Sequence, residues 1–169
     1  MKIDNFETDR FIVKKFSLKF INKNYLDWFN DCEVNKFITF NPKNLDDLKN
    51  DVLKTLKLKN AYFFAIFHKK KHIGNIKIHN IDYQQNKAWL GILIGDKNFR
   101  GIGVTPEIVK FIKISLIKKK IYFLRLNVDK KNIQAIKSYL KSGFVVEKTH
   151  NNFYTMRANI YPKKRVLKF

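Results

Sequence analysis

The run from Ala88 to Leu116, AWLGILIGDKNFRGIGVTPEIVKFIKISL, constrains the fold more than any other part of the chain. It begins with an apolar segment of strand length, continues into a polar turn in which Gly101 and Gly103 are spaced Gly-x-Gly, and ends in the apolar spacing of an amphipathic helix. Thr105 is a favourable N-cap and Pro106 suits the first helical position, so we expect the helix to begin there. A strand that turns directly into a helix indicates a layered α/β architecture.

The glycine turn also indicates an anion site. Glycine tolerates a positive φ and allows a ligand to approach the backbone closely. The N-terminus of the following helix offers free N–H groups and a partial positive charge, which suit a phosphate or a diphosphate. A Walker A loop is excluded because no Gly-Lys-Ser/Thr follows, and a dinucleotide-binding fingerprint is excluded because its third glycine is missing. Gly-x-Gly alone is equally typical of a plain strand-to-helix turn, so the turn by itself leaves both interpretations open.

The rest of the chain continues the alternation of strands and helices. Asn24, Asn44 and Asn132 are predicted to cap the three other helices, and Gly143 suits the position after the last of these. The order is strand, two helices, three strands, helix, strand, helix and two strands, which predicts a mixed sheet with helices on both faces in a single domain over residues 1–169. The expected strands are 11–15, 61–67, 75–79, 88–94, 122–128, 144–147 and 153–160.

Composition restricts the class of protein. The chain has 169 residues, is 45% hydrophobic and contains 16 Phe, which favours a folded core over disorder. Its apolar runs are too short to span a bilayer, and the polar start MKIDNFETDR differs from a signal peptide, so we expect a cytoplasmic protein. The single cysteine, Cys32, excludes an internal disulfide and a cysteine-based zinc site. Because Cys32 follows Tyr25, Trp28 and Phe29 at helical spacing, we expect it to be buried.

The net charge of +21 comes almost entirely from lysine. Such a charge favours polyanionic partners, including nucleic acid, acidic membrane surfaces and phosphate-bearing substrates. Lys, Asn, Ile and Phe are abundant together, which an AT-rich coding sequence would also produce. The lysines are spread along the whole chain and form no recognisable nucleic-acid-binding module, so nucleic acid is a possible partner but not the favoured one.

The order of elements, the FRGIG turn and the segment NVDKKNIQAIKSYLKSGF together resemble the GNAT acetyltransferase superfamily. The resemblance covers nearly the whole chain and is strongest to the branch with the Rim-type ribosomal-protein N-acetyltransferases and many amino-sugar acetyltransferases. It implies a seven-stranded mixed sheet, splayed between strands four and five, with four helices on both faces. It also implies acetyl-CoA as donor, a primary amine as acceptor, and a monomer or homodimer, while the spacing of the histidines and carboxylates suggests no metal site.

The same resemblance assigns roles to residues. Tyr139 corresponds to the tyrosine that protonates the departing thiolate, and Asn132 to an asparagine that contacts the cofactor. One departure is Asn98, which stands where the family has Gln or Arg, so Arg100 beside the turn is expected to supply the charge. The other cofactor-binding positions are the strand edge Ile92, Leu93 and Ile94 and the turn residues Phe99, Gly101, Ile102, Gly103, Val104 and Thr105.

The general base and the acceptor are less constrained. His79, at the end of the third strand, is the first candidate for the base, and the others are His68, His72, His150, Glu33 and Asp82. The positive charge disfavours a polyamine acceptor and favours one that carries phosphate, with a nucleotide-linked amino sugar first and a ribosomal-protein-type N-terminus second. A non-catalytic basic adaptor that binds RNA or an acidic protein is the third hypothesis.

Overall fold

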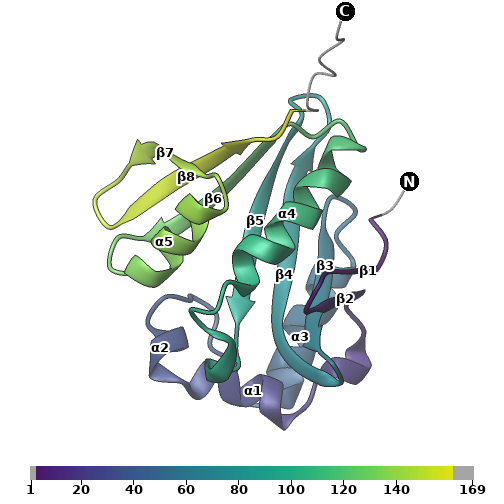
Figure 1. The fold of residues 1–169 in the computed structure, drawn as a ribbon. Helices are drawn as coiled ribbons and strands as arrows, with labels where there is room; N and C mark the ends of the chain where they lie inside the picture. The colour runs from purple at the N-terminus through teal and green to yellow at the C-terminus, as the bar shows by residue number, and fades with distance from the viewer. Residues whose placement is uncertain (1–2, 162–169) are drawn as a thin grey trace, which may run out of the picture.

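The computed structural model describes residues 3–161 and shows one eight-stranded mixed sheet in the order β1-β2-β3-β4-β5-β6-β8-β7 (Figure 1). The strands are β1 (Phe6–Glu7), β2 (Ile12–Lys15), β3 (Tyr62–His68), β4 (Lys71–Asp82), β5 (Lys87–Ile94), β6 (Phe123–Asp129), β7 (Val145–Thr149) and β8 (Phe153–Asn159). The helices are α1 (Lys23–Asn30), α2 (Cys32–Asn35), α3 (Leu45–Leu56), α4 (Val104–Ile117) and α5 (Ile133–Lys141).

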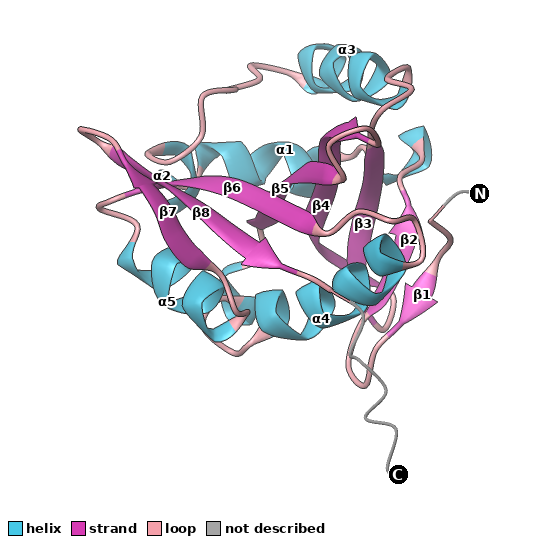
Figure 2. Cartoon of the chain, turned by 90° about the horizontal axis from the view of Figure 1, so that it is seen from above, coloured by secondary structure: helices cyan, strands magenta, loops and turns pink. Residues whose placement is uncertain are grey.

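The helices cover the two faces of the sheet unequally. Figure 2 shows α4 and α5 on one face, and α1 and α3 on the other. The first face carries the larger core, in which Ile108, Ile112 and Leu116 of α4 pack on the sheet with no more than 1% of their surface exposed. The second core is smaller and gathers Trp28 and Leu48 from the helices of the other face. This mixed α/β architecture with helices on both faces confirms the fold class expected from the sequence.

The sheet opens between β5 and β6, the fourth and fifth of the strands expected from the sequence. The two strands run parallel and pair only through Lys87–Phe123, Ala88–Leu124 and Trp89–Arg125. After Trp89 they separate, although β5 continues to pair with β4 as far as Ile94. The predicted splay is therefore present, and the last five residues of β5 have a strand partner on one side only.

The counts of strands and helices differ from the expectation. The eighth strand is β1, which pairs Phe6 with Val13 and is too short to show any alternation in the sequence. The fifth helix is α2, because the first expected helix stops at Asn30 and a new one begins after Asp31, whose side chain accepts from the Glu33 N–H. This break places Cys32 on the surface, so its predicted burial is wrong.

Some local predictions also need correction. Asn22, and not Asn24, caps α1 by accepting from the Tyr25 N–H, whereas Asn44 caps α3 as predicted. Gly143 follows α5 with φ 77°, as expected of a residue after a helix. Strand β4 begins at Lys71 where a longer turn was expected, because the chain already reverses at Lys69, whose φ is 54°. No helix within residues 3–161 is long and apolar enough to cross a membrane.

Candidate active site

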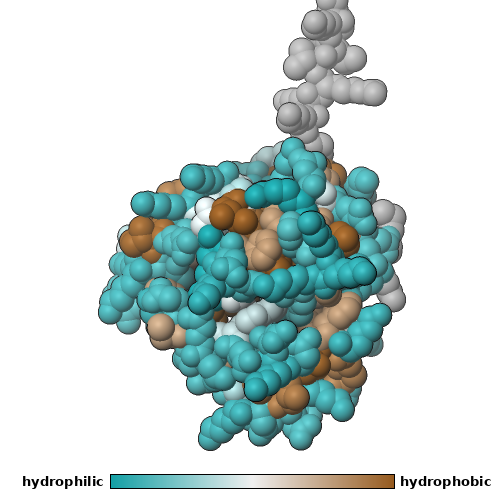
Figure 3. Space-filling view, turned by 60° about the horizontal axis from the view of Figure 1, so that its bottom comes forward, coloured by the Kyte–Doolittle hydropathy of each residue, from teal (hydrophilic) through white to brown (hydrophobic). Residues whose placement is uncertain are grey.

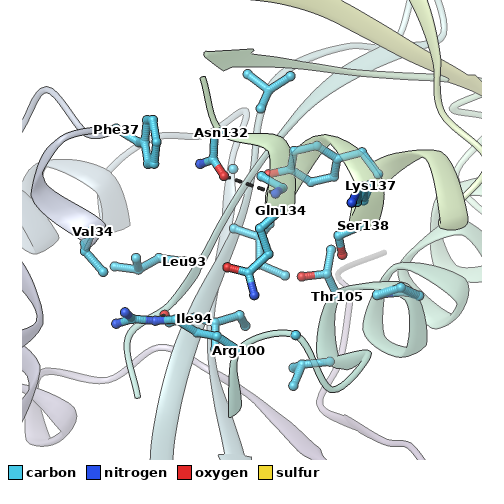
Figure 4. A pocket seen from close by; sticks show the side chains of 18 of the residues that line it. Val34, Phe37, Leu93, Ile94, Arg100, Thr105, Asn132, Gln134, Lys137 and Ser138 are labelled. Carbon is cyan, nitrogen blue, oxygen red and sulfur yellow. Dashed lines mark hydrogen bonds between the residues drawn. The ribbon is translucent and has the colours of Figure 1, made fainter. Parts of the chain in front are cut away.

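A cavity of about 440 Å³ lies where β5 and β6 separate. Its walls come from α2, the end of β5, the glycine turn, the start of α4, the end of β6 and α5, so it joins both sides of the sheet opening (Figure 4). Most residues that the sequence assigned to cofactor binding or to catalysis line it: Ile92, Leu93, Ile94, Phe99, Arg100, Gly101, Gly103, Val104, Thr105, Asn132 and Tyr139. Ile102 does not line it, and its side chain is 48% exposed.

The glycine turn has the backbone geometry that the sequence predicted. Gly101 and Gly103 have φ values of 77° and 85°, in the left-handed region that side chains with a Cβ disfavour. The start of α4 was predicted wrongly, since its N-cap is Gly103 and Thr105 is already inside the helix. Gly103 has no side chain that could accept from the first N–H groups of α4. These groups therefore remain available at the cavity wall, as an anion would require.

Arg10, from the loop before β2, braces this turn from outside the cavity. Its Nε donates to Glu107 Oε2 at 2.7 Å and its Nη1 donates to the carbonyl of Ile102 at 3.0 Å. Glu107 also accepts from the Thr8 hydroxyl at 2.6 Å. Partial burial would raise the pKa of Glu107, but these hydrogen bonds and the charge of Arg10 outweigh it, and the pKa is lowered. Nothing in the sequence points to Arg10, because 97 residues separate it from its carboxylate partner.

Arg100 lines the cavity but does not present a free charge to the turn. Its Nε donates to the carbonyl of Ile94 at 3.0 Å and its Nη1 forms an ion pair with Asp31 at 2.8 Å. Figure 4 shows the guanidinium pointing away from Thr105. Asn98 is exposed and lies outside the cavity. Arg100 therefore does not supply the charge that was expected of it at the turn in place of the family's Gln or Arg. Its side chain instead links the start of α2 to the end of β5.

Tyr139 and Asn132 lie at opposite ends of one wall, on α5. The Asn132 side-chain oxygen accepts from the Ala135 N–H at 3.0 Å and caps the helix. Tyr139 is only 9% exposed, and its ring packs edge-on against Phe144 at 5.9 Å. Burial raises the pKa of the Tyr139 phenol to about 12, which keeps it protonated at neutral pH. A buried, protonated phenol at a cavity wall can donate a proton or a hydrogen bond to an anion that forms there.

The candidate bases are scattered, and Glu33 is the one of the six that lines the cavity. His79 lies opposite Trp89 in the β4–β5 pairing, outside the cavity, and burial lowers its pKa. His72 is packed among aromatic rings, with Trp28 at 4.8 Å. The carboxylate of Asp82 accepts from the backbone of the β4–β5 turn. Within residues 3–161 no group of three or more His, Cys, Asp or Glu side chains could hold a metal ion.

Helix α5 also has a polar face that the sequence alone did not indicate. Gln134, Lys137, Ser138 and Lys141 all line the cavity, at the spacing i, i+3, i+4 and i+7 of one helix face. The apolar spacing of Ile133 and Leu140 predicts that both face inward, but they are 54% and 51% exposed. The helix is rotated relative to the prediction because Tyr139 is the side chain that it buries. The molecular surface seen from this end is mostly hydrophilic, with scattered apolar side chains (Figure 3).

Comparison with known proteins agrees with this geometry. The profile of the Acetyltransferase (GNAT) domain matches residues 10–145. A search of curated protein sequences finds no match. The structure is similar to the Microcin C7 self immunity acetyltransferase MccE in complex with acetyl-CoA and AMP, with 19% identity and a TM-score of 0.76, over 90% of this chain and 93% of that one.

Two further structures share the fold. One is spermidine N-acetyltransferase from Vibrio cholerae in complex with CoA and spermine, with 17% identity and a TM-score of 0.71, over 89% of this chain and 96% of that one. The other is AAC(6')-Ib in complex with paromomycin and acetyl-CoA, with 14% identity and a TM-score of 0.76, over 89% of this chain and 94% of that one. Identities this low establish fold alone. The profile match spans more than half of the sequence, including the glycine turn and α5, so the chain belongs to the GNAT acetyltransferase family.

Proposed function

We propose that this protein transfers an acetyl group from acetyl-CoA to the primary amine of a nucleotide-linked amino sugar. The observation that carries the reaction type is the meeting of three features in one cavity. These are the uncapped start of α4 after Gly103, the one-sided end of β5, and the buried phenol of Tyr139. The first suits a diphosphate, the second offers backbone groups to an extended amide chain, and the third suits a leaving thiolate.

The chemistry follows from what each group can supply. Beyond Trp89, alternate residues of β5 direct their backbone groups into the gap, where the N–H of Leu93 or Ile94 can polarise a thioester carbonyl. Attack by the neutral amine expels the thiolate, and Tyr139 supplies a proton as that charge develops. Burial disfavours the charged form of a thiol as it does that of the phenol, so a thiolate that forms in this cavity gains from a proton or a hydrogen bond from Tyr139. Glu33, at the acceptor end of the cavity, is the candidate to take the amine proton.

The acceptor proposal rests on the face of β6 that points away from α4 and α5. Asn127 of this strand lines the cavity, and Arg125 is two residues earlier on the same face, about 7 Å along the strand. Arg125 and Arg157 share one carboxylate, Glu147, with Nε–Oε2 and Nη1–Oε1 distances of 2.6 and 3.2 Å. The cluster keeps one net positive charge, and the buried Nε of Arg157 has no hydrogen-bond partner. A diphosphate one sugar ring away from the reacting amine would fit this charge.

The carboxylates of the cavity do not favour a polyamine. Those among its lining residues are Glu33 and Asp129. Glu33 forms an ion pair with Lys36 at 2.7 Å, and Asp129 accepts from the Lys131 N–H at 2.7 Å. A polyamine would have to compete with these partners and enter a strongly cationic protein. The charge distribution instead supports an acceptor that carries phosphate.

The test is a panel of acceptors incubated with acetyl-CoA and the purified protein. It contains UDP- and dTDP-amino sugars, the free amino sugars, N-terminal peptides and spermidine. We expect turnover of nucleotide-linked sugars, and Arg125→Gln should raise their KM about tenfold while leaving the KM of the free sugars unchanged. If only the peptides are acetylated, the amino-sugar proposal is refuted and the acceptor is a protein N-terminus. RNA binding with a steep salt dependence and no binding of acetyl-CoA would favour the basic adaptor.

A further inference from the structure

The start of α4 suits a diphosphate, but the arginines nearest to it are already paired. Arg100 is bound to Asp31 and to the carbonyl of Ile94, and Arg10 is bound to Glu107 outside the cavity. The other cations that line the cavity are Lys137 and Lys141, both on α5. Neither has an ion-pair partner among residues 3–161, in contrast to the two arginines.

The two lysines belong to a continuous polar face. Gln134, Lys137, Ser138 and Lys141 extend over about 10 Å of α5, on the cavity side of the helix. Figure 4 shows the Gln134 amide in the middle of the cavity, and the Lys137 and Ser138 side chains beside it, opposite Thr105. A Cβ built on Gly101 would lie 3.1 Å from Gln134 Nε2, so this amide is in contact with the turn itself.

We infer that this face of α5 is a phosphate-binding surface, with Gln134 and Lys137 on the diphosphate and Lys141 on the ribose phosphate of coenzyme A. The assignment deepens the proposed function and rests on it. Gln134 lies nearest to the glycine turn and can donate through its amide. Lys137 and Lys141 follow at one and two helical turns. Because Arg100 is already paired, these two lysines provide the positive charge that the glycine turn itself lacks. The anion is therefore held between two helices, by backbone groups of α4 and side chains of α5.

The test measures binding and needs no turnover. Isothermal titration is carried out with CoA, dephospho-CoA and pantetheine on the wild type, Gln134→Ala, Lys137→Ala and Lys141→Ala. The control is Lys110→Ala, which removes the same charge from an exposed position of α4 outside the cavity. Because these side chains are exposed, each variant should melt as the wild type does.

We expect Gln134→Ala and Lys137→Ala to weaken CoA and dephospho-CoA alike, by about fivefold each at low salt, and to leave pantetheine unchanged. Lys141→Ala should weaken CoA by a similar factor but not dephospho-CoA. The lysine variants should also show a shallower salt dependence than Lys110→Ala.

If the wild type binds CoA and all four variants bind it equally well, the inference is overturned and the proposed function stands. An equal loss for pantetheine would also overturn it, because the residues would then act on the cavity shape and not on phosphate. Failure of the wild type to bind CoA or acetyl-CoA would instead refute the proposed function.

Discussion

Replacement of Gly101 by alanine tests whether the glycine turn binds the donor, and Gly143→Ala is its matched control. Both glycines have φ 77°, and an added Cβ would meet the end of a flexible side chain at each, Gln134 Nε2 at 3.1 Å and Lys113 Nζ at 3.3 Å. Only the first of the two glycines lines the cavity. The two substitutions therefore impose the same backbone strain at a binding and at a non-binding position.

The magnitude follows from the backbone. A left-handed conformation costs an alanine about 1–2 kcal/mol, and the stiffer unfolded chain returns about 0.4–1 kcal/mol. The net loss is about 1 kcal/mol for either variant, which lowers the Tm of a chain of this size by about 2–4 °C. Differential scanning calorimetry should show the same shift for Gly101→Ala and Gly143→Ala.

The affinities should differ. In Gly101→Ala the methyl group occupies the space that an anion needs against the turn, so titration calorimetry with acetyl-CoA should show a loss of at least about tenfold, or about 1.4 kcal/mol. Gly143→Ala should stay within about twofold, because its strain is confined to the end of α5. Equal losses in the two variants, or wild-type affinity in Gly101→Ala, would refute the assignment of the turn.

Three further predictions concern the surroundings of the turn. Tyr139→Phe should lower kcat about 100-fold at an unchanged Kd for acetyl-CoA, as measured by steady-state kinetics and calorimetry, and an unchanged kcat would contradict its role as acid. Glu107 has a folded pKa below its unfolded value near 4.3, so it stabilises the fold above that pH and loses this contribution as the pH falls through the lowered value. When the pH is lowered from about 6 to about 3, the free energy of unfolding measured by urea titration should therefore fall more in the wild type than in Glu107→Gln. An equal fall in both would show that the ion pair with Arg10 does not stabilise the fold. Gly95→Ala would place a methyl group inside the Trp28 ring, and we expect a loss of about 1–3 kcal/mol in denaturant titrations, whereas a wild-type midpoint would mean that α1 moves freely.

The sequence determined the elements whose signals are local. The left-handed glycines of the turn and the Asn44 cap follow from neighbouring residues and were predicted correctly, and the period of two in Leu124, Leu126 and Val128 matches their burial on one face of β6. These features depend on steric rules within one turn or on a period of two, which a single chain already displays. The resemblance in the turn and in α5 was also enough to indicate the family before any geometry was known.

Tertiary structure decided what each side chain meets. Arg100 stands beside the turn in the sequence, but its guanidinium pairs with Asp31 and with the end of β5, and Arg10 contacts the same turn at Ile102 from 92 residues away. The rotation of α5 was decided by the burial of Tyr139, which turned Gln134 and Lys137 into the cavity. Ion pairs and helix rotation depend on partners distant in the chain, so local periodicity carries no information about them. The polar residues that line the cavity could therefore be identified only from the assembled sheet and helices.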